Sequence, residues 1–263
     1  MTATGYQVLG LRDIPMVQPG DDLAALLGTA LDANSVSLGD GDVLCLAQKI
    51  VSKAEGCQVA LSTITPGAEA MRLADLTGKD SRVVQLILDE STEVLRHKPN
   101  VLIVRHKLGI VGAHAGIDQS NIEHDGDEYA LLLPPDPDAS AERLRAALAA
   151  RYQCQIGVVI TDSHNRPWRM GTIGCAIGCA GIKVLDDQRG GTDLFGRDLQ
   201  ATLINRADAL ASAATLVMGE TTEGLPAVVL RGLPMAETLI EPSRDASATA
   251  QCINRPLAED MFR

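Results

Sequence analysis

The chain has 263 residues, of which 46% are hydrophobic, 22% charged and 2% aromatic. Its 34 acidic and 23 basic residues give a net charge of -11, which opposes binding to the phosphates of nucleic acids. No stretch approaches the ~20 apolar residues of a membrane span, and residues 1–10 lack the pattern of a signal peptide. We therefore expect a cytoplasmic protein that binds neither nucleic acid nor membranes.

Short apolar runs alternate with segments of helical periodicity along the whole chain, which predicts a mixed α/β (α+β) fold. Asp136 and Pro137 give the clearest helix start, with Asp136 as N-cap and Pro137 at the first helical position. In chain order, the predicted elements are a strand at Tyr6–Leu11, a helix at Asp22–Ala33, a strand at Asp42–Ala47, a helix at Ala68–Leu76, a strand at Val101–Val104, a helix at Pro137–Tyr152, strands at Ile156–Thr161 and Ile182–Leu185, a helix at Ala207–Met218 and a strand at Ala227–Leu230.

The segments between these elements include loops rich in charge and glycine, where binding and catalytic residues are often found. These loops are predicted at His114–Glu128, Asp162–Gly174, Asp186–Asp198 and Gly219–Pro226. The six cysteines form no CxxC pair, so we expect buried thiols rather than disulfides or a metal site. Cys175 and Cys179 lie in a run of small residues, where cysteine can pack as a small hydrophobic side chain.

Several common motifs are absent from the sequence, namely GxxxxGK[ST], GxGxxG, HExxH and GxSxG. Three acidic residues, Asp118, Asp162 and Glu220, lie instead at the ends of apolar segments. Two carboxylates ~4 Å apart repel by about 4 kcal/mol at an effective dielectric constant of 20, so their convergence would favour a bound cation. With the hydroxyl of Ser163, such a group would suit Mg²⁺ or Mn²⁺, whereas each acid alone is more typical of a turn or helix cap.

Basic residues near the glycine-rich segments are candidates for neutralising phosphate oxygens, with solvated surface charge as the alternative. They are Lys49, Lys53, Arg166, Arg169, Arg189 and Arg197. Lys53 stands out because it closely follows the strand predicted to end at Ala47. The histidines lack zinc-ligand spacing, but His114 and His124 flank the Asp118 loop, where each is either an acid–base or substrate-contact residue or an exposed loop histidine.

Six segments together carry a resemblance to a known family. They are GDVLCLAQKIVSKAEG (Gly41–Gly56), HKLGIVGAHAGIDQSN (His106–Asn121), LLLPPDPDASAERLR (Leu131–Arg145), GVVITDSHNRPWRMG (Gly157–Gly171), GGTDLFGRDL (Gly190–Leu199) and MGE (Met218–Glu220) followed by GLPAVVLRGL (Gly224–Leu233). In order and length these segments resemble the coenzyme F420-0:L-glutamate ligases, which add glutamate to a deazaflavin cofactor. The resemblance covers nearly the whole chain.

The resemblance implies a homodimeric, GTP-dependent amide ligase whose substrates are coenzyme F420-0, L-glutamate and GTP. It implies one unit over residues 1–263, with the ligase-like fold of two intertwined lobes, no P-loop or Rossmann motif, and no fused C-terminal nitroreductase-like domain. GTP would phosphorylate the acceptor carboxylate, and the amine of L-glutamate would displace phosphate. One or more glutamates would be added, with γ-linkages after the first. Two sites for Mg²⁺ or Mn²⁺ and an assisting K⁺ are also implied.

By matching motifs, Asp118 and Asp162 resemble the ligands of a first metal, and Ser163 and Glu220 those of a second. Asp118, Asp162 and Lys53 are the implied catalytic residues. The implied GTP contacts are Leu11, Arg12, Asp13, Ile14, Gln48, Lys49, Lys53, Asn121, Met218, Gly219, Glu220, Thr221, Thr222, Glu223, Gly224 and Leu225.

The sequence departs from the family pattern at His114, where Asn is common, and at Ser163-His164-Asn165, where a Thr-containing triplet is more frequent. An alternative function is therefore a ligase of the same family that acts on another carboxylate-bearing small molecule. A catalytically silent nucleotide-binding protein is a third possibility, against which the retained Asp118, Asp162 and Glu220 argue.

Overall fold

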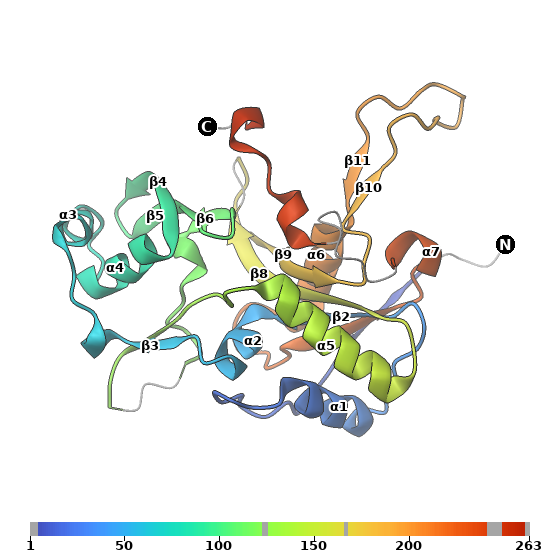
Figure 1. Cartoon of the computed structure of the whole chain (residues 1–263), viewed down its shortest axis with the longest axis horizontal. Helices are drawn as coiled ribbons and strands as arrows, with labels where there is room; N and C mark the ends of the chain where they lie inside the picture. Colours follow the sequence, from blue (N-terminus) through green and yellow to red (C-terminus); the bar gives the residue numbers. More distant parts are fainter. Residues whose placement is uncertain (1–4, 123–125, 166–167, 241–248, 261–263) are drawn as a thin grey trace.

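A computed structural model of the chain describes residues 5–122, 126–165, 168–240 and 249–260. Its largest sheet has five strands in the order β1-β12-β2-β8-β9, with β2 and β8 parallel and the other neighbours antiparallel (Figure 1). The strands of this sheet are β1 (Gln7–Gly10), β2 (Val43–Ala47), β8 (Gly157–Asn165), β9 (Thr172–Ala180) and β12 (Ala227–Arg231).

Both faces of this sheet are covered, which explains the continuous apolar run of β2. Val43 and Cys45 belong to the core shared with helix α6 (Arg206–Met218). Leu44 and Leu46 point the other way, into the core shared with α1 (Leu23–Ala33) and α5 (Pro137–Tyr152). Figure 1 shows α1 and α5 in front of the sheet and α6 behind it. The predicted mixed α+β fold is confirmed.

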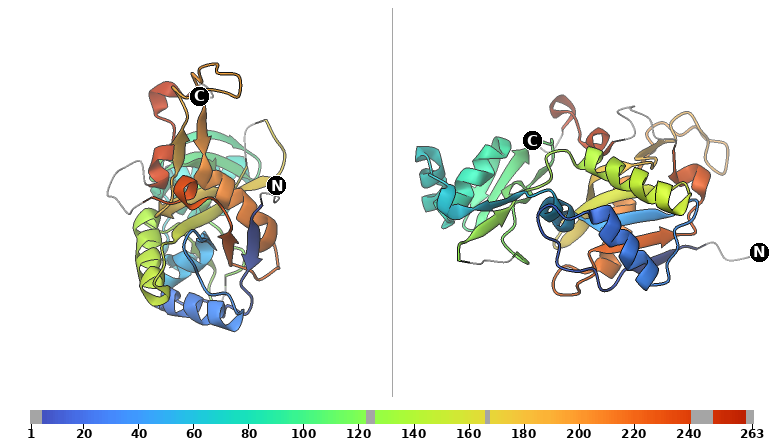
Figure 2. Two further views of the ribbon diagram at one scale, coloured as in Figure 1. Left: turned by 90° about the vertical axis from the view of Figure 1, so that its right-hand side faces the viewer. Right: turned by 60° about the horizontal axis from the view of Figure 1, so that its bottom comes forward.

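A smaller body, formed by residues 58–122 and 126–131, has its own apolar core and lies beside the large sheet (Figure 2). A three-stranded sheet, β4-β5-β6, packs there against two helices. The chain enters this body through β3 and leaves it through β7. These two strands pair antiparallel, so the two connecting segments are hydrogen bonded to each other. The elements of this body are β3 (Gln58–Ala60), α3 (Ala68–Thr77), α4 (Ser81–Asp89), β4 (Ser91–Lys98), β5 (Val101–His106), β6 (Val111–Ala113) and β7 (Tyr129–Leu131).

A hairpin arm made of β10 (Leu185–Asp187) and β11 (Leu203–Asn205) projects from the sheet body (Figure 1). Asp186 fastens its base, because this buried carboxylate accepts hydrogen bonds from Arg206 and lies 2.6 Å from Lys183 Nζ. These partners lower the pKa of Asp186 to about 2. The remaining short elements are α2 (Gln48–Ala54), α7 (Met235–Thr238) and the 3-10 turns at Leu61–Thr63, His114–Gly116, Ala250–Ile253 and Leu257–Glu259. Among the described residues, no helix has the length and apolar character to cross a membrane.

The predicted loop at Asp162–Gly174 is wrong in most of its length. Strand β8 continues to Asn165 and β9 begins at Thr172, so the two strands form a hairpin where a loop was expected. The polar residues at the end of β8 hid this extension, because they interrupt the apolar run that marked the strand. Likewise, the predicted strand at Ile182–Leu185 is reduced to an isolated bridge at Ile182 before β10 begins.

The small-residue run before Gly181 forms β9, which lies between α6 and α5. Gly174 faces Ala211 and Thr215 of α6, and Gly178 faces Pro137 of α5, so closely that a Cβ at either glycine would overlap its neighbour. The need for close approach between a strand and two helices therefore explains this composition. The predicted burial is confirmed for Cys45 and Cys179, whereas the other four cysteines are partly exposed.

Candidate functional site

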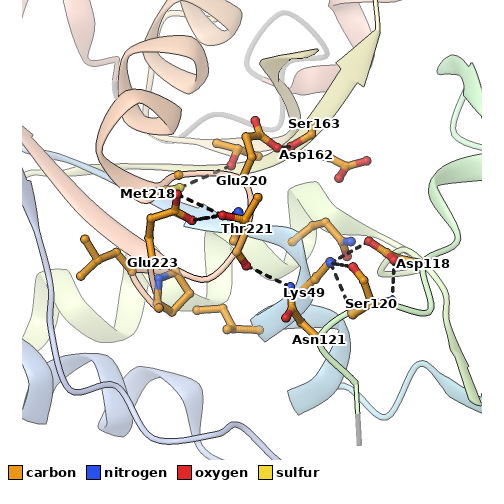
Figure 3. A pocket seen from close by; sticks show the side chains of 18 of the residues that line it. Lys49, Asp118, Ser120, Asn121, Asp162, Ser163, Met218, Glu220, Thr221 and Glu223 are labelled. Atoms are coloured by element: carbon orange, nitrogen blue, oxygen red, sulfur yellow. Dashed lines mark hydrogen bonds and ion pairs between the residues drawn. The ribbon is translucent and has the colours of Figure 1, made fainter. Parts of the chain in front are cut away.

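A cavity of about 620 Å³ opens at one edge of the large sheet, a size typical of small-molecule sites (Figure 3). Strand β2 ends at this edge beside Thr161 of the parallel β8, which continues to Asn165, and the antiparallel β12 begins there. Helix α2 follows β2 directly, so its first residues lie at this edge. Polar side chains from α2, from β8 and from the segment before β12 therefore line the same cavity. Such a crevice beyond the carboxyl ends of parallel strands is a common ligand site in α/β proteins.

Most of the predicted site residues line this cavity. They are Ile14, Gln48, Lys49, Lys53, Asp118, Asn121, Asp162, Ser163, Met218, Gly219, Glu220, Thr221, Thr222, Glu223, Gly224 and Leu225. Leu11, Arg12 and Asp13 do not line it. Leu11 is fully buried in the core, and the backbone N–H and C=O of Arg12 are both hydrogen bonded to the side chain of Asn34.

Lys49 and Asp118 form an ion pair in the cavity, with 2.6 Å between Lys49 Nζ and Asp118 Oδ2. Lys49 also donates to the hydroxyl of Ser120 over 2.9 Å, and the backbone N–H of Ser120 donates to Asp118 Oδ1 over 2.7 Å. Burial alone would raise the pKa of Asp118, but the hydrogen bonds from Lys49 and Ser120 outweigh it and hold the pKa below its ordinary value. Asp118 is therefore a carboxylate at neutral pH, with both oxygens engaged.

Lys53 and Asn121 connect three segments of the cavity wall. Lys53 Nζ donates to the backbone carbonyl of Asn121 over 2.7 Å. The side-chain amide of Asn121 donates in turn to the carbonyl of Thr221 over 3.3 Å. Asn121 has a φ of 56°, a left-handed conformation that asparagine tolerates better than most residues. This chain of contacts joins α2 and the Asp118 loop to the segment at residues 218–225.

The end of β8 presents Asp162 and Ser163 to opposite sides of the strand, as the alternation of strand side chains requires. Ser163 donates a hydrogen bond to Glu220, so this predicted pair of metal ligands is in contact. On the other side, His164 Nε2 lies 3.2 Å from Asp162 Oδ2, but the two groups are not aligned for a hydrogen bond. The β8–β9 pairing has a register shift between Ile160 and Thr161, immediately before Asp162. Such irregularities often change the direction of side chains near functional sites.

Gly219 ends helix α6 and begins the segment at residues 219–225. Its φ of 73° and ψ of -177° belong to a region that is essentially restricted to glycine. A Cβ at this position would overlap the side chain of Glu223. Glu223 instead folds back and accepts a hydrogen bond from the N–H of Thr221 over 2.8 Å. The glycine therefore allows the compact turn that brings Glu220 to Ser163.

Gln48 supplies a buried polar group to the cavity wall. Its Oε1 accepts a hydrogen bond from Ser52 over 2.8 Å, but its Nε2 is buried and lacks a hydrogen-bond partner among the described residues. An unsatisfied buried donor costs free energy unless a ligand or water engages it. This amide is therefore suited to donate to an acceptor in the cavity.

The motif segments that meet at this cavity match a known family. The model of the F420-0:Gamma-glutamyl ligase family matches residues 12–232. The chain belongs to this family. It is 44% identical over 262 residues to the coenzyme F420:L-glutamate ligase of Methanopyrus kandleri, across 98% of this chain and 99% of that protein. The ligases of the same name from Methanothermobacter thermautotrophicus (43% over 230 residues) and Halobacterium salinarum (45% over 224 residues) match 88% and 83% of this chain and 90% and 83% of their own lengths. The predicted family is thus confirmed.

The four metal ligands predicted for this ligase-family chain all line the cavity, but only Ser163 and Glu220 are in direct contact with each other. Within the described ranges, no group of three His, Cys, Asp or Glu side chains is arranged to hold a metal ion. The oxygen donors nevertheless fit Mg²⁺, which commonly binds one or two carboxylates and completes its shell with water and substrate phosphates. Asp118 already forms an ion pair with the ammonium group of Lys49, so a positively charged group fits next to this carboxylate.

Several lining residues were not predicted from the sequence, among them Met16, Ser120 and Thr215. The position of Ser120 two residues after Asp118, in a segment quoted for the family resemblance, is a turn signal that could have identified it. The other basic and histidine candidates fall outside the cavity wall or outside the described residues. Arg169, Arg189, Arg197 and His114 do not line the cavity, and Arg166 and His124 lie outside the described residues.

Proposed function

We propose that this protein is a GTP-dependent ligase that adds L-glutamate, once or repeatedly and with γ-linkages after the first, to coenzyme F420-0. The names of its relatives support the reaction and the acceptor. The observation that carries the proposal is the convergence on one cavity of Lys49, Lys53, Asp118, Asp162 and Glu220, which lie far apart in the sequence. Together they supply the opposite charges that a phosphate-bearing substrate and its counter-cations require.

The proposed chemistry has two steps. First, an oxygen of the acceptor carboxylate attacks the γ-phosphorus of GTP, and the bond to the β-phosphate oxygen breaks to release GDP. Second, the neutral amine of L-glutamate attacks the carbonyl carbon of the acyl phosphate, inorganic phosphate leaves, and the nitrogen loses a proton. The new amide bond therefore derives its driving force from GTP cleavage.

The protein's part in this chemistry is to bind and orient charged groups. Lys49 and Lys53 lie one turn apart on α2 and can direct two ammonium groups to phosphate oxygens. Gln48 offers a buried amide donor to the same ligand. Asp118 with Asp162, and Ser163 with Glu220, would hold the two divalent cations. When bound, these cations neutralise the charge of the transferring phosphoryl group.

A direct assay tests this function. The purified protein is mixed with GTP, L-glutamate, Mn²⁺ or Mg²⁺ and F420-0, and GDP release and product mass are followed together. We expect GDP release coupled to mass gains of whole glutamyl units. A folded, GTP-binding protein that leaves the mass of F420-0 unchanged would refute this acceptor. The same assay with other carboxylate-bearing small molecules would then test the alternative ligase function.

The Asp162→Asn variant tests the role of the predicted metal ligands. We expect it to abolish ligation with little change in the unfolding temperature, because it removes a charge that the bound cation neutralises. Asp89→Asn is the matched control, since Asp89 lies on the surface of the smaller body and accepts from Gln85. Full ligase activity of Asp162→Asn would exclude Asp162 as an essential ligand.

The resemblance to the family also leads us to propose a cytoplasmic homodimer assisted by K⁺. Sedimentation velocity tests the dimer, and replacement of K⁺ by Na⁺ in the ligation assay tests the potassium requirement. A monomer at assay concentration would contradict the first proposal, and equal rates in both salts would contradict the second.

A further inference from the structure

Lys49 occupies the position that a cation bound to Asp118 would need. Its ammonium group contacts Asp118 Oδ2 at 2.6 Å, Ser120 Oγ at 2.9 Å and the carbonyl of Ser120 at 3.3 Å (Figure 3). The three N–H groups of an ammonium thus have three oxygen partners. The second carboxylate oxygen, Asp118 Oδ1, accepts from the backbone N–H of Ser120. Both oxygens of Asp118 therefore have hydrogen-bonding partners, and Oδ2 becomes available to a cation only when Lys49 moves away.

A divalent cation and the ammonium group of Lys49 would compete for Asp118 Oδ2. Mg²⁺ binds carboxylate oxygen at about 2.0–2.1 Å, so it would approach the oxygen that Lys49 already holds. The two positive charges would then lie close together in a half-buried cavity, where electrostatic repulsion is stronger than in water. The binding of a cation at Asp118 Oδ2 consequently requires Lys49 to leave.

The cavity offers Lys49 another place when a nucleotide is bound. Lys49 is on the first turn of α2, and Lys53 lies one turn later on the same face, with its Nζ on the carbonyl of Asn121. A lysine side chain is unbranched and flexible, and its ammonium group binds phosphate well. Phosphates placed beside α2 would therefore form a new ion pair with Lys49, which would then leave Asp118.

We propose that Lys49 holds Asp118 in the nucleotide-free protein and exchanges that partner for the phosphates of a nucleoside triphosphate, which makes cation binding at Asp118 dependent on the nucleotide. The proposal rests on the proposed function in one respect, namely that Asp118 is a metal ligand. Lys49 thereby acts as a positioning residue that prevents a cation from binding before the substrate phosphates are in place. By linkage, the cation raises the affinity for the nucleotide by the same factor.

The test is a titration of Mn²⁺ alone, in which electron paramagnetic resonance measures the free ion at constant ionic strength. All proteins carry Glu220→Gln, which removes the second predicted site and leaves the site at Asp118. We expect Lys49→Met to bind Mn²⁺ at least about fivefold more tightly than the parent protein, which carries Glu220→Gln alone. The reason is that Lys49 no longer competes with Mn²⁺ for Asp118. Lys49→Arg should bind Mn²⁺ like the parent, since it keeps the charge.

Lys53→Met is the matched control for the loss of one positive charge from the same helix face. Its ammonium group contacts the carbonyl of Asn121, so we expect its Mn²⁺ affinity to stay within about twofold of the parent. Thermal unfolding checks that each variant is folded, and Lys49→Gln provides a second neutral variant if Lys49→Met is not. An unchanged Mn²⁺ affinity in a folded neutral variant would overturn the proposal.

A second titration measures the dependence on the nucleotide. GTP is added in the absence of acceptor, and the Mn²⁺ bound by GTP in protein-free solution is subtracted. We expect GTP to increase the Mn²⁺ affinity of the parent by a larger factor than that of Lys49→Met. Equal factors in the two proteins would contradict the exchange of partners.

The ligation assay on the natural protein separates this inference from the proposed function. If that protein ligates glutamate but Lys49→Met leaves Mn²⁺ binding unchanged, the exchange of partners is wrong and the function stands. If no ligation occurs but Lys49→Met tightens Mn²⁺ binding, the exchange stands and the proposed acceptor is wrong.

Discussion

Gly219 gives the sharpest test of how the cavity is built. Its φ of 73° and ψ of -177° lie in a region that costs side-chain-bearing residues about 1–3 kcal/mol. In Gly219→Ala, the added Cβ would also overlap Glu223 and displace it from the N–H of Thr221. The backbone strain sets the expected loss of unfolding free energy at about 1–3 kcal/mol. For a chain of this size, each kcal/mol lowers the unfolding temperature by about 2–4 °C.

The same substitution should weaken GTP binding by about tenfold or more, because residues 219–225 line the cavity and a displacement of ~1 Å can be costly at such sites. Calorimetric titration with GTP measures the affinity, and differential scanning calorimetry measures the unfolding temperature. Gly78→Ala is the matched control, because Gly78 lies at the end of α3 and does not line the cavity. Its φ of 72° is also strained for alanine, but a Cβ there would meet no atom within 4 Å.

The two variants separate strain from displacement. Gly78→Ala should lose stability and keep its GTP affinity, whereas Gly219→Ala should lose both. In Gly219→Ala with Glu223→Ala, the steric overlap is removed and the backbone strain remains, so stability should recover only in part. If Gly219→Ala matches the natural protein in both unfolding temperature and GTP affinity, the geometry assigned to this turn is wrong.

Three further predictions concern the packing and titration of the fold. Gly178→Ala should lower the unfolding free energy by about 2–3 kcal/mol, measured by urea unfolding, because the new Cβ would overlap the backbone of Pro137; a smaller loss than about 1 kcal/mol would contradict this close contact. Cys45 and Cys179 should resist alkylation at pH 8 until the protein unfolds, because burial raises the pKa of both thiols; peptide mass mapping measures this, and rapid labelling of the native protein would disprove it. Burial also lowers the pKa of His106, so the folded protein favours the neutral imidazole. The contribution of His106 to the free energy of unfolding should therefore be fully present above pH 6.5 and decrease as the pH falls below it. Urea unfolding at pH 7.5 and 5.5 checks the sign, and His106→Gln should reduce the difference.

Sequence patterns located the elements whose environment is uniform along their length. Asp136 caps α5 through the N–H of Ala139, as the Asp-Pro start predicted, because capping is a local interaction. Strand β2 was also found, since both of its faces are buried and its apolar run is continuous. Helix α2 and strand β4 were missed. The first follows β2 without a loop, and the second has exposed polar residues that obscure its periodicity.

The candidate site was visible in the sequence as motifs, but its assembly was not. Asp118, Asp162 and Glu220 were recognised by type and by resemblance, because the residues that carry chemistry are read directly from the chain. Their neighbours depend on where separate strands end. The pairing of β2 with β8 brings α2 beside β8, and the packing of α6 against β8 and β9 sets Glu220 beside Ser163.

The pairing of Lys49 with Asp118 is a product of tertiary structure alone. The two residues are far apart in the chain, and the sequence predicted a nucleotide contact for one and a metal ligand for the other. Composition, caps and apolar runs are local properties, so the sequence by itself determined the fold class, the main helices and the family. The ion-pair partner of a charged residue in the cavity, such as Lys49, depends on which segments meet at the sheet edge. Because these segments are distant in the sequence, only the tertiary structure determines the pairing.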